Sequence, residues 1–380
     1  MCETQKHTKP NVPNLRFPGF EGEWKCNKLS SYLYENKERN RAGEFNKTDV
    51  LSVSGDCGIV NQIELLGRSF AGKSVADYHI VRTGNIVYTK SPLKEYPYGI
   101  VKYNSGKDGI VSTLYAVYHH RENVNGRFVE HYFTSPQRTN RYFKPIVRIG
   151  AKHDMKIGNN EVIDNTVFFP SLDEQNKITE LLDLLDQRIA IQSKVIERYE
   201  SLIKALSHEI IGRNRPNSVL KDIVNCSSST MKESDLNDNI QMVPTYGAAG
   251  LSGYIDKCLS ERDSILITKD GSGVGSLRYV SEKHSFVGTL NSLTPKEGIY
   301  LPYVYYALFN VNFENYRTGQ AIPHIYFKDY GKEAIYCPTY ENQKRLAKGL
   351  ELIDAKTEYE RAELHGLLSI KAYLMANLFI

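Results

Sequence analysis

Residues Pro170–Ile178 read PSLDEQNKI, and the pattern recurs at Pro338–Leu346 as PTYENQKRL, 168 positions later. A proline, a hydroxyl residue, an acid, Gln175 or Gln343 and a closing aliphatic residue occupy matching positions. Self-similarity at a fixed, long offset is typical of a duplicated structural unit. The 380-residue chain is therefore expected to contain two copies of one design.

Both copies open a heptad pattern, in which seam residues are spaced alternately by four and three. The first seam is Ile178, Leu182, Leu185, Ile189, Gln192, Ile196, Tyr199, Ile203, Leu206 and Ile210. The second, less regular, is Leu346, Leu350, Ile353, Thr357, Glu360, Leu364, Leu367, Lys371, Leu374 and Leu378. Each seam predicts a helix of about 50 Å.

Ser171 and Thr339 are the expected N-caps of these helices, and Glu174 would complete a capping box in the first copy. A single apolar stripe is equally typical of core packing inside one globular domain. Two copies at one offset favour an antiparallel helix pair, whose register a polar layer of Gln192 and Glu360 could set.

The segments that precede the helices also match one another, and they favour strands because β-branched and aromatic residues dominate them. The matching blocks are NIVYTK (85–90) with SILITK (264–269), and IVSTLYAV (110–117) with FVGTLNSL (286–293). The GRNRPNSV stretch at 212–219 would stop the first helix. The predicted fold class is mixed α+β: globular domains at 1–170 and 214–337, followed by helices at 171–213 and 338–380 that pack as an antiparallel coiled coil.

Composition limits the class of protein. The net charge is +4, so any polyanionic partner would be met by local basic patches. No apolar run of about 18 residues is present, and the N-terminus lacks a signal-peptide core, which favours a cytoplasmic protein. The six cysteines are scattered without metal-ligand spacing, so they are expected to be reduced thiols, with no metal site.

Four segments together resemble one family. They are LRFPGFEGEWKCNKLSS at 15–31, the domain end P-x-x-[DE]-x-Q before each heptad helix, PTYGAAGLSGYIDK at 244–257 and ITKDGSGVG at 267–275. Their order and the duplication are similar to the specificity subunit of type I restriction-modification enzymes, a bacterial defence system. The resemblance covers nearly the full length, and the arrangement of the motifs carries it.

The resemblance implies two target recognition domains, each of which reads one half of a split sequence in double-stranded DNA. The helices would set the spacing of the half-sites and dock methyltransferase subunits, expected to be two, with restriction subunits also in the complex. It implies no catalysis by this chain: S-adenosylmethionine for DNA methylation, ATP and Mg would be bound by the partner subunits. No membrane partner is implied.

The two recognition segments differ, since KSPLKEYPYG (90–99) and KDGSGVG (269–275) are unlike in length and chemistry, so an asymmetric, bipartite target is expected. Basic side chains suit phosphates and guanine, although most of them are simply solvated in any protein. The DNA-binding candidates are Lys73, Lys90, Lys94, Tyr96, Tyr98, Arg138, Arg141, Lys152, Lys269, Arg278, Arg317 and His324, the last of which could equally be structural. The candidates for the coiled coil and partner docking are Leu182, Leu185, Ile189, Ile196, Ile203, Leu350, Ile353, Leu364 and Leu367.

Catalytic residues are not assigned, because no amino-methyltransferase motif or paired nucleophile and base is recognisable. GRSFAGKS at 67–74 does match a P-loop, which makes a nucleotide-binding protein an alternative. Its flanks lack the buried strand and the helix that a P-loop needs, so a turn before a strand is expected, with Lys73 free to contact DNA phosphate. A coiled-coil scaffold with two protein-binding domains is a third hypothesis.

Overall fold

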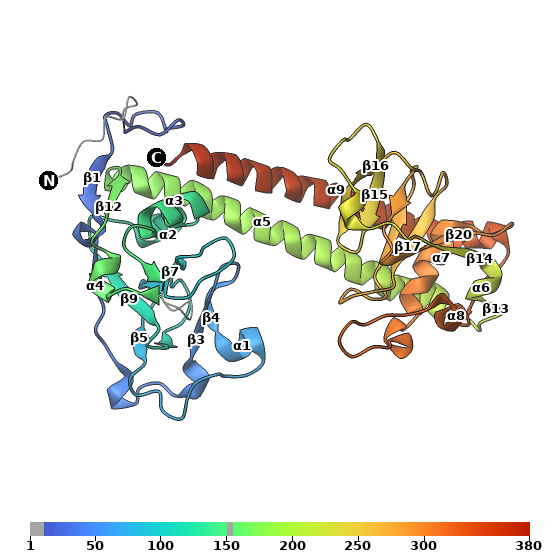
Figure 1. Cartoon of the computed structure of the whole chain (residues 1–380), viewed down its shortest axis with the longest axis horizontal. Coiled ribbons are helices and arrows are strands. Elements are labelled where there is room, and N and C mark those ends of the chain that lie inside the picture. Colours follow the sequence, from blue (N-terminus) through green and yellow to red (C-terminus); the bar gives the residue numbers. More distant parts are fainter. Residues whose placement is uncertain (1–10, 150–154) are drawn as a thin grey trace. The chain divides into compact units, whose positions relative to one another are not determined.

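The computed structural model describes residues 11–149 and 155–380 (Figure 1). It divides into two compact units, one comprising residues up to Ala190 together with His365–Ile380, the other Ile191–Leu364. Two long helices, α5 (Leu172–Ser207) and α9 (Tyr340–Asn377), contribute to both units. The domain boundaries inferred from the sequence stay a prediction, but both helices begin within two residues of their expected starts.

The first unit is built on an antiparallel sheet of order β2-β9-β6-β7, formed by Leu33–Glu35, Tyr115–His120, Ile86–Thr89 and Val101–Tyr103. Helices α2 (Gly126–Phe133) and α3 (Pro136–Phe143) contribute aromatic side chains to its core, where Tyr88 stacks on Phe143 at 4.6 Å between ring centroids. The remaining strands are β1 (Lys25–Lys28), β3 (Leu51–Ser54), β4 (Gly58–Asn61), β5 (His79–Val81), β8 (Gly109–Val111), β10 (Arg148–Ile149), β11 (Met155–Lys156) and β12 (Thr166–Phe169). The short helices are α1 (Gln62–Leu66) and α4 (Asn159–Val162).

The second unit repeats this plan with the sheet order β14-β20-β17-β18, formed by Val224–Ser228, Leu290–Pro295, Ser264–Thr268 and Leu277–Val280. A three-stranded sheet of β16 (Gly250–Ile255), β15 (Val243–Gly247) and β19 (Ser285–Phe286) is added to it. The remaining elements are β13 (Ser218–Val219), α6 (Leu220–Ile223), α7 (Leu301–Ala307), α8 (Phe327–Tyr330) and β21 (Ala334–Ile335).

The two sheets confirm the duplication at the level of strand order and strand pairing, although their registers differ by one residue. Strands β6 and β9 pair Ile86 with Tyr118 and Thr89 with Tyr115, while β17 and β20 pair Ile265 with Leu293. These are the blocks that the sequence matched to one another. One correction applies to each unit: the second block of each copy forms two strands joined by a turn, β8 with β9 and β19 with β20, where one strand was predicted.

Within the first unit, α5 and α9 run antiparallel. The Asp186 carboxylate pairs with the Lys371 ammonium at 2.5 Å, and Leu182 shares a buried cluster with Met375 and Leu378 near the end of the chain. Because earlier residues of α5 meet later residues of α9, the helices must point in opposite directions.

The same antiparallel pairing holds within the second unit, where Gln192 Nε2 donates to the Glu360 carbonyl at 3.1 Å and also contacts its carboxylate. Farther along the pair, Ile203 and Leu350 are buried in one cluster. The predicted antiparallel coiled coil and its polar layer are confirmed. In the part of the chain that the structure describes, no helix is long and apolar enough to cross a membrane.

The predicted capping box at the start of α5 is wrong in one half. The Glu174 N–H does approach Ser171 Oγ, at 3.4 Å. The Glu174 carboxylate, however, is buried and accepts hydrogen bonds from Arg16 Nε at 2.8 Å and Nη2 at 2.7 Å, and from Trp24 Nε1 at 3.4 Å. The acid therefore ties the N-terminal segment to the helix.

The repeated glutamine has the same role in both units. Gln175 Nε2 donates to the Pro170 carbonyl at 3.1 Å, and its Oε1 accepts from the Asn125 N–H, at the N-cap of α2, at 3.0 Å. Gln343 repeats both bonds at 2.8 Å, to the Pro338 carbonyl and from the Tyr300 N–H, at the N-cap of α7. Each long helix is thus fastened to its own globular part by one buried amide.

Candidate nucleic-acid interface

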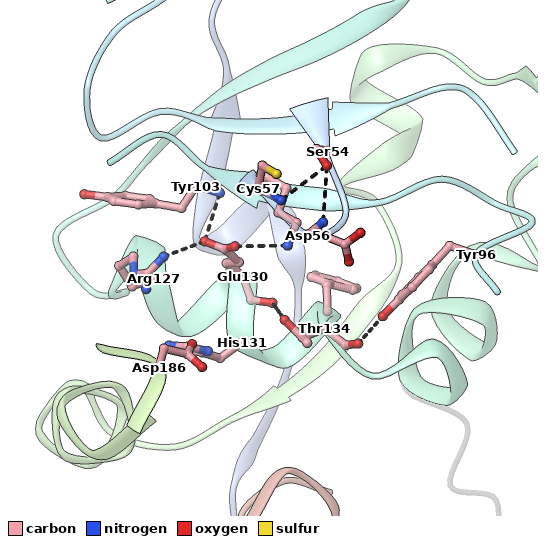
Figure 2. A network of polar contacts seen from close by, with 12 residues as sticks. Ser54, Asp56, Cys57, Tyr96, Tyr103, Arg127, Glu130, His131, Thr134 and Asp186 are labelled. Atoms are coloured by element: carbon pink, nitrogen blue, oxygen red, sulfur yellow. Dashed lines mark hydrogen bonds and ion pairs between the residues drawn. The ribbon is translucent and has the colours of Figure 1, made fainter. Parts of the chain in front are cut away.

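Several of the first unit's candidates are held by internal hydrogen bonds. Lys90 Nζ donates to the Ile157 carbonyl at 3.0 Å and to Asn159 Oδ1 at 2.7 Å, and burial lowers the pKa of its ammonium. The Tyr96 hydroxyl donates to the Thr134 carbonyl, as Figure 2 shows. These two side chains position the loop between β6 and β7, and their polar atoms are not free to meet a ligand.

The same loop exposes Lys94, and Lys73 is exposed in the loop before β5. Tyr98 lies half-buried against the aromatic core, and its carbonyl accepts from the Tyr88 hydroxyl at 2.5 Å. Lys152 lies outside the described residues. Among the described first-unit candidates, Lys73 and Lys94 therefore present their charges most freely to an approaching polyanion.

Arg138 requires a correction, because the structure places it in the interior. Its side chain is only 8% exposed, Nε donates to the Tyr132 carbonyl at 2.9 Å, and Nη1 donates to the Met375 carbonyl at 3.0 Å. Its guanidinium also lies 4.5 Å from the centre of the Phe379 ring. Arg138 is thus a structural residue that holds the end of α9, and neighbouring Arg141, although exposed, donates to the Ile380 carbonyl at 3.2 Å.

Three second-unit candidates are brought together from distant parts of the chain. The loop after β17 contains Lys269, and its carbonyl accepts from the Ile325 N–H at 2.9 Å. His324 pairs through its backbone with Thr318, next to the exposed Arg317. Lys269 Nζ is 2.5 Å from Asp270 Oδ2, and Arg317 Nη1 is 3.1 Å from Glu314 Oε2. These three candidates therefore lie close together, although the Lys269 and Arg317 cations are partly neutralised.

The fourth candidate, Arg278, lies elsewhere in the second unit. It is exposed on β18, and its guanidinium is 5.9 Å from the centre of the Tyr246 ring. The surface around His324 also contains residues that sequence reasoning missed. Gln320 is exposed and Ile322 is 66% exposed, both between the paired residues Thr318 and His324.

A cavity with a volume of about 930 Å³ lies in the first unit. Its polar lining is a structural network (Figure 2): the Glu130 carboxylate accepts from the Tyr103 N–H at 3.3 Å and pairs with Arg127 at 2.9 Å. Arg127 also pairs with Asp183 at 2.6 Å, which joins α2 to α5. Although burial alone would raise the pKa of Asp183, hydrogen bonds from His131 and Arg127 lower it to about 2. These groups neutralise one another.

The P-loop alternative is wrong. Gly67 ends the short helix α1 in a left-handed conformation, and residues 67–74 form an irregular loop that leads toward β5. The described residues contain no helix directly after Ser74, so no helix N-terminus is available to bind phosphate there. Groups of acidic, histidine and cysteine side chains able to hold a metal ion are also absent from the residues described.

The nine predicted seam residues lie inside the helix pair and the unit cores, and none of them is fully exposed. Leu182, Ile196, Ile203 and Leu350 are buried; the half-buried members are Leu185, Ile189, Ile353, Leu364 and Leu367. Other apolar side chains of these helices are exposed. They are Leu184, Leu368, Ile370 and Tyr373 in the first unit, and Ile191, Leu202, Leu352 and Tyr359 in the second.

One known family matches part of the second half of the chain. Residues 217–368 match the family model of the type I restriction modification DNA specificity domain. A curated Mycoplasma genitalium protein, named as a type I specificity subunit S, is 24% identical over 233 residues. That match covers 56% of this chain and 61% of the relative, so the chain matches about three fifths of that relative's length.

The fold is shared with a solved type I restriction-modification S subunit from M. genitalium, at a TM-score of 0.64 and 17% identity. The alignment covers 97% of this chain and 99% of that one. A chain from a structure that describes complex assembly of the type I system aligns at a TM-score of 0.49 with 15% identity, over 97% and 99% of the two chains. The predicted resemblance and the predicted fold class are both confirmed.

Proposed function

We propose, from the membership of residues 217–368 in the type I restriction modification DNA specificity domain family, that the whole chain is the DNA-reading subunit of such a restriction-modification complex. Each unit would read one half of a bipartite target. The observation that carries this proposal is one sheet plan, built twice with equivalent strand order, whose surface loops differ in length and charge. Two readers with unlike loops on one chain suit an asymmetric target, because each half-site is recognised by different side chains.

The partners in this proposal are two methyltransferase subunits and the restriction subunits. The exposed apolar side chains of α5 and α9 support a docking role for the helices, because they are accessible to another protein. The docking residues would therefore be Leu184, Ile191, Leu352, Tyr359 and their exposed neighbours in place of the buried seam.

The chain itself would be non-catalytic. S-adenosylmethionine, ATP and Mg would be bound by the partner subunits, and a methyltransferase would have to extrude the target adenine from the duplex to reach it. Work on genomic DNA would require a cytoplasmic location.

The proposal predicts DNA binding that weakens steeply with salt and strengthens when methyltransferase subunits are present. Lys94 and Arg278 are exposed, and the described residues hold neither of them in an ion pair. If they contact phosphates, Lys94→Ala and Arg278→Ala should each lower the slope of log K against log salt by roughly 1.

Lys283→Ala is the matched control, because Lys283 already pairs with Glu261 at 3.6 Å. Fluorescence anisotropy with the complex and labelled duplexes measures both quantities. Equal affinity of the assembled complex for every unrelated duplex would contradict the proposed function.

A further inference from the structure

We infer that the hairpin Thr318–His324 is the base-reading element of the second unit, with Gln320 and Ile322 recognising an adenine–thymine pair in the major groove. This inference rests on the proposed function and adds the residues and the base that one half of the site uses. Neither side chain belongs to the basic set predicted from the sequence.

The hairpin is rigid at its base. The Thr318 N–H donates to the His324 carbonyl and the His324 N–H to the Thr318 carbonyl, both at 2.9 Å. Gly319 has a φ of +83°, and a Cβ at this position would lie 2.4 Å from the Ile322 carbonyl oxygen. Only glycine fits this turn without strain, so the tip residues are presented in one backbone conformation.

The hairpin is also fastened to the sheet. The Gly271 N–H donates to the Pro323 carbonyl at 2.9 Å, and the Ile325 N–H donates to the Lys269 carbonyl at the same distance. These bonds join the tip to the loop that follows the core strand β17. A contact made by the tip is therefore supported by the core, and little ordering entropy remains to oppose binding.

The chemistry of the tip suits base recognition. Gln320 is exposed, and a glutamine amide can bond adenine N6 and N7 at once, whereas an exposed aliphatic side chain can contact the thymine methyl group. Ile322 is 66% exposed, so its aliphatic side chain is accessible to a base at the tip of the hairpin. Arg317, whose side chain is 43% exposed, lies beside the hairpin where a phosphate could be met.

The duplication supplies an independent argument. Strands β10 and β11 of the first unit pair Ile149 with Met155, six residues apart, as the Thr318–His324 bridge does in the second. The intervening sequences are GAKHD at 150–154, which lies outside the described residues, and GQAIP at 319–323. They share only the glycine. Backbone pairs of equal span in both units, which enclose unlike sequences, are the arrangement expected of two readers with different half-sites.

The test uses the full chain with its methyltransferase subunits and selection from random duplexes. The wild-type complex should select a bipartite motif with an adenine–thymine pair in one half. Gln320→Ala should reduce discrimination at that pair by about 5- to 100-fold and leave the other half unchanged. Ile322→Ala should weaken the preference for thymine at the same or an adjacent position, and Gln241→Ala, an exposed glutamine of the same unit, is the control.

Gln320→Glu supplies a gain that unfolding cannot imitate, since a carboxylate accepts from cytosine N4 and should move the preference toward cytosine. A wild-type complex that selects no motif would refute the proposed function itself. If the wild type selects a motif but Gln320→Ala and Gln320→Glu select the same one with equal strength, the inference alone is overturned.

Discussion

Replacement of Gln175 by methionine should destabilise the first unit. The buried amide of Gln175 joins the start of α5 to the segment just before the helix and to the N-cap of α2. The amide bonds the carbonyl before the helix and the N–H at the N-cap of α2. Methionine resembles glutamine in length and flexibility, so it fills the same space. The substitution therefore removes two hydrogen bonds and changes packing little.

The magnitude follows from the groups left behind. The Pro170 carbonyl is buried and the Asn125 N–H is half-buried, and each would lose its partner. A buried polar group without a partner costs about 1–3 kcal/mol, and some water will reach the half-buried group. The expected loss in free energy of unfolding is about 2–4 kcal/mol, and Gln343→Met should cause a similar loss in the second unit.

Urea unfolding followed by tryptophan fluorescence gives a direct assay, because Trp24 is the single tryptophan and is buried in the first unit's core. Gln175→Met should lower the midpoint by roughly 1 M or more. Gln187→Met is the matched control, an exposed glutamine on the same helix. If the two variants unfold within about 0.5 kcal/mol of one another, the stabilising role given to the Gln175 amide is refuted.

Four further outcomes are expected. Gln192→Leu alone should cost about 1–3 kcal/mol in urea unfolding, because the buried Glu360 carboxylate loses its amide donor while its ion pair with Lys356 remains. Adding Glu360→Leu should recover most of that loss. Hydrogen bonds lower the pKa of Asp183 to about 2, so the stability difference between wild type and Asp183→Asn should be constant above about pH 5. The difference should shrink as the pH falls from about 5 toward 2, and urea midpoints measured at each pH would reveal it. Phe379→Ala should cost about 3–5 kcal/mol by the same fluorescence assay, because this ring is only 4% exposed in the aromatic core. ATP binding in equilibrium dialysis should stay at background in both wild type and Lys73→Ala; saturable binding lost in the variant would revive the P-loop hypothesis.

The long helices and their pairing could be predicted because heptad spacing is a short-range pattern that can be recognised within one segment of the sequence. Leu172 begins α5 one residue after the expected boundary. The polar layer of Gln192 and Glu360 was also predictable, since one polar position per seam must meet another if the register is to match. The strands β6 and β17 were found for a similar reason: each is a short apolar run bounded by polar or glycine residues.

The candidate interface was harder to predict from the sequence, because the burial of a side chain depends on contacts between residues that are far apart in the sequence. Arg138 lies in a basic stretch that indicates an exposed surface, yet its partner at Met375 is 237 positions away. Gln320 and Ile322 were missed because the candidates were chosen among basic and aromatic side chains, and the prominence of these two arises from a hairpin fastened to β17. The signal available was the Gly319 and Pro323 pair that brackets the tip, which is typical of a tight turn.

The central claim, that the chain reads an asymmetric bipartite DNA target, is tested most directly by mapping methylated adenines base by base in DNA from cells that contain this chain with its methyltransferase subunits. The account predicts methylation confined to one motif, with two unlike blocks of defined bases separated by a constant number of unspecified ones. Methylation at a single contiguous or palindromic motif, or a pattern unchanged when this chain is deleted, would contradict it.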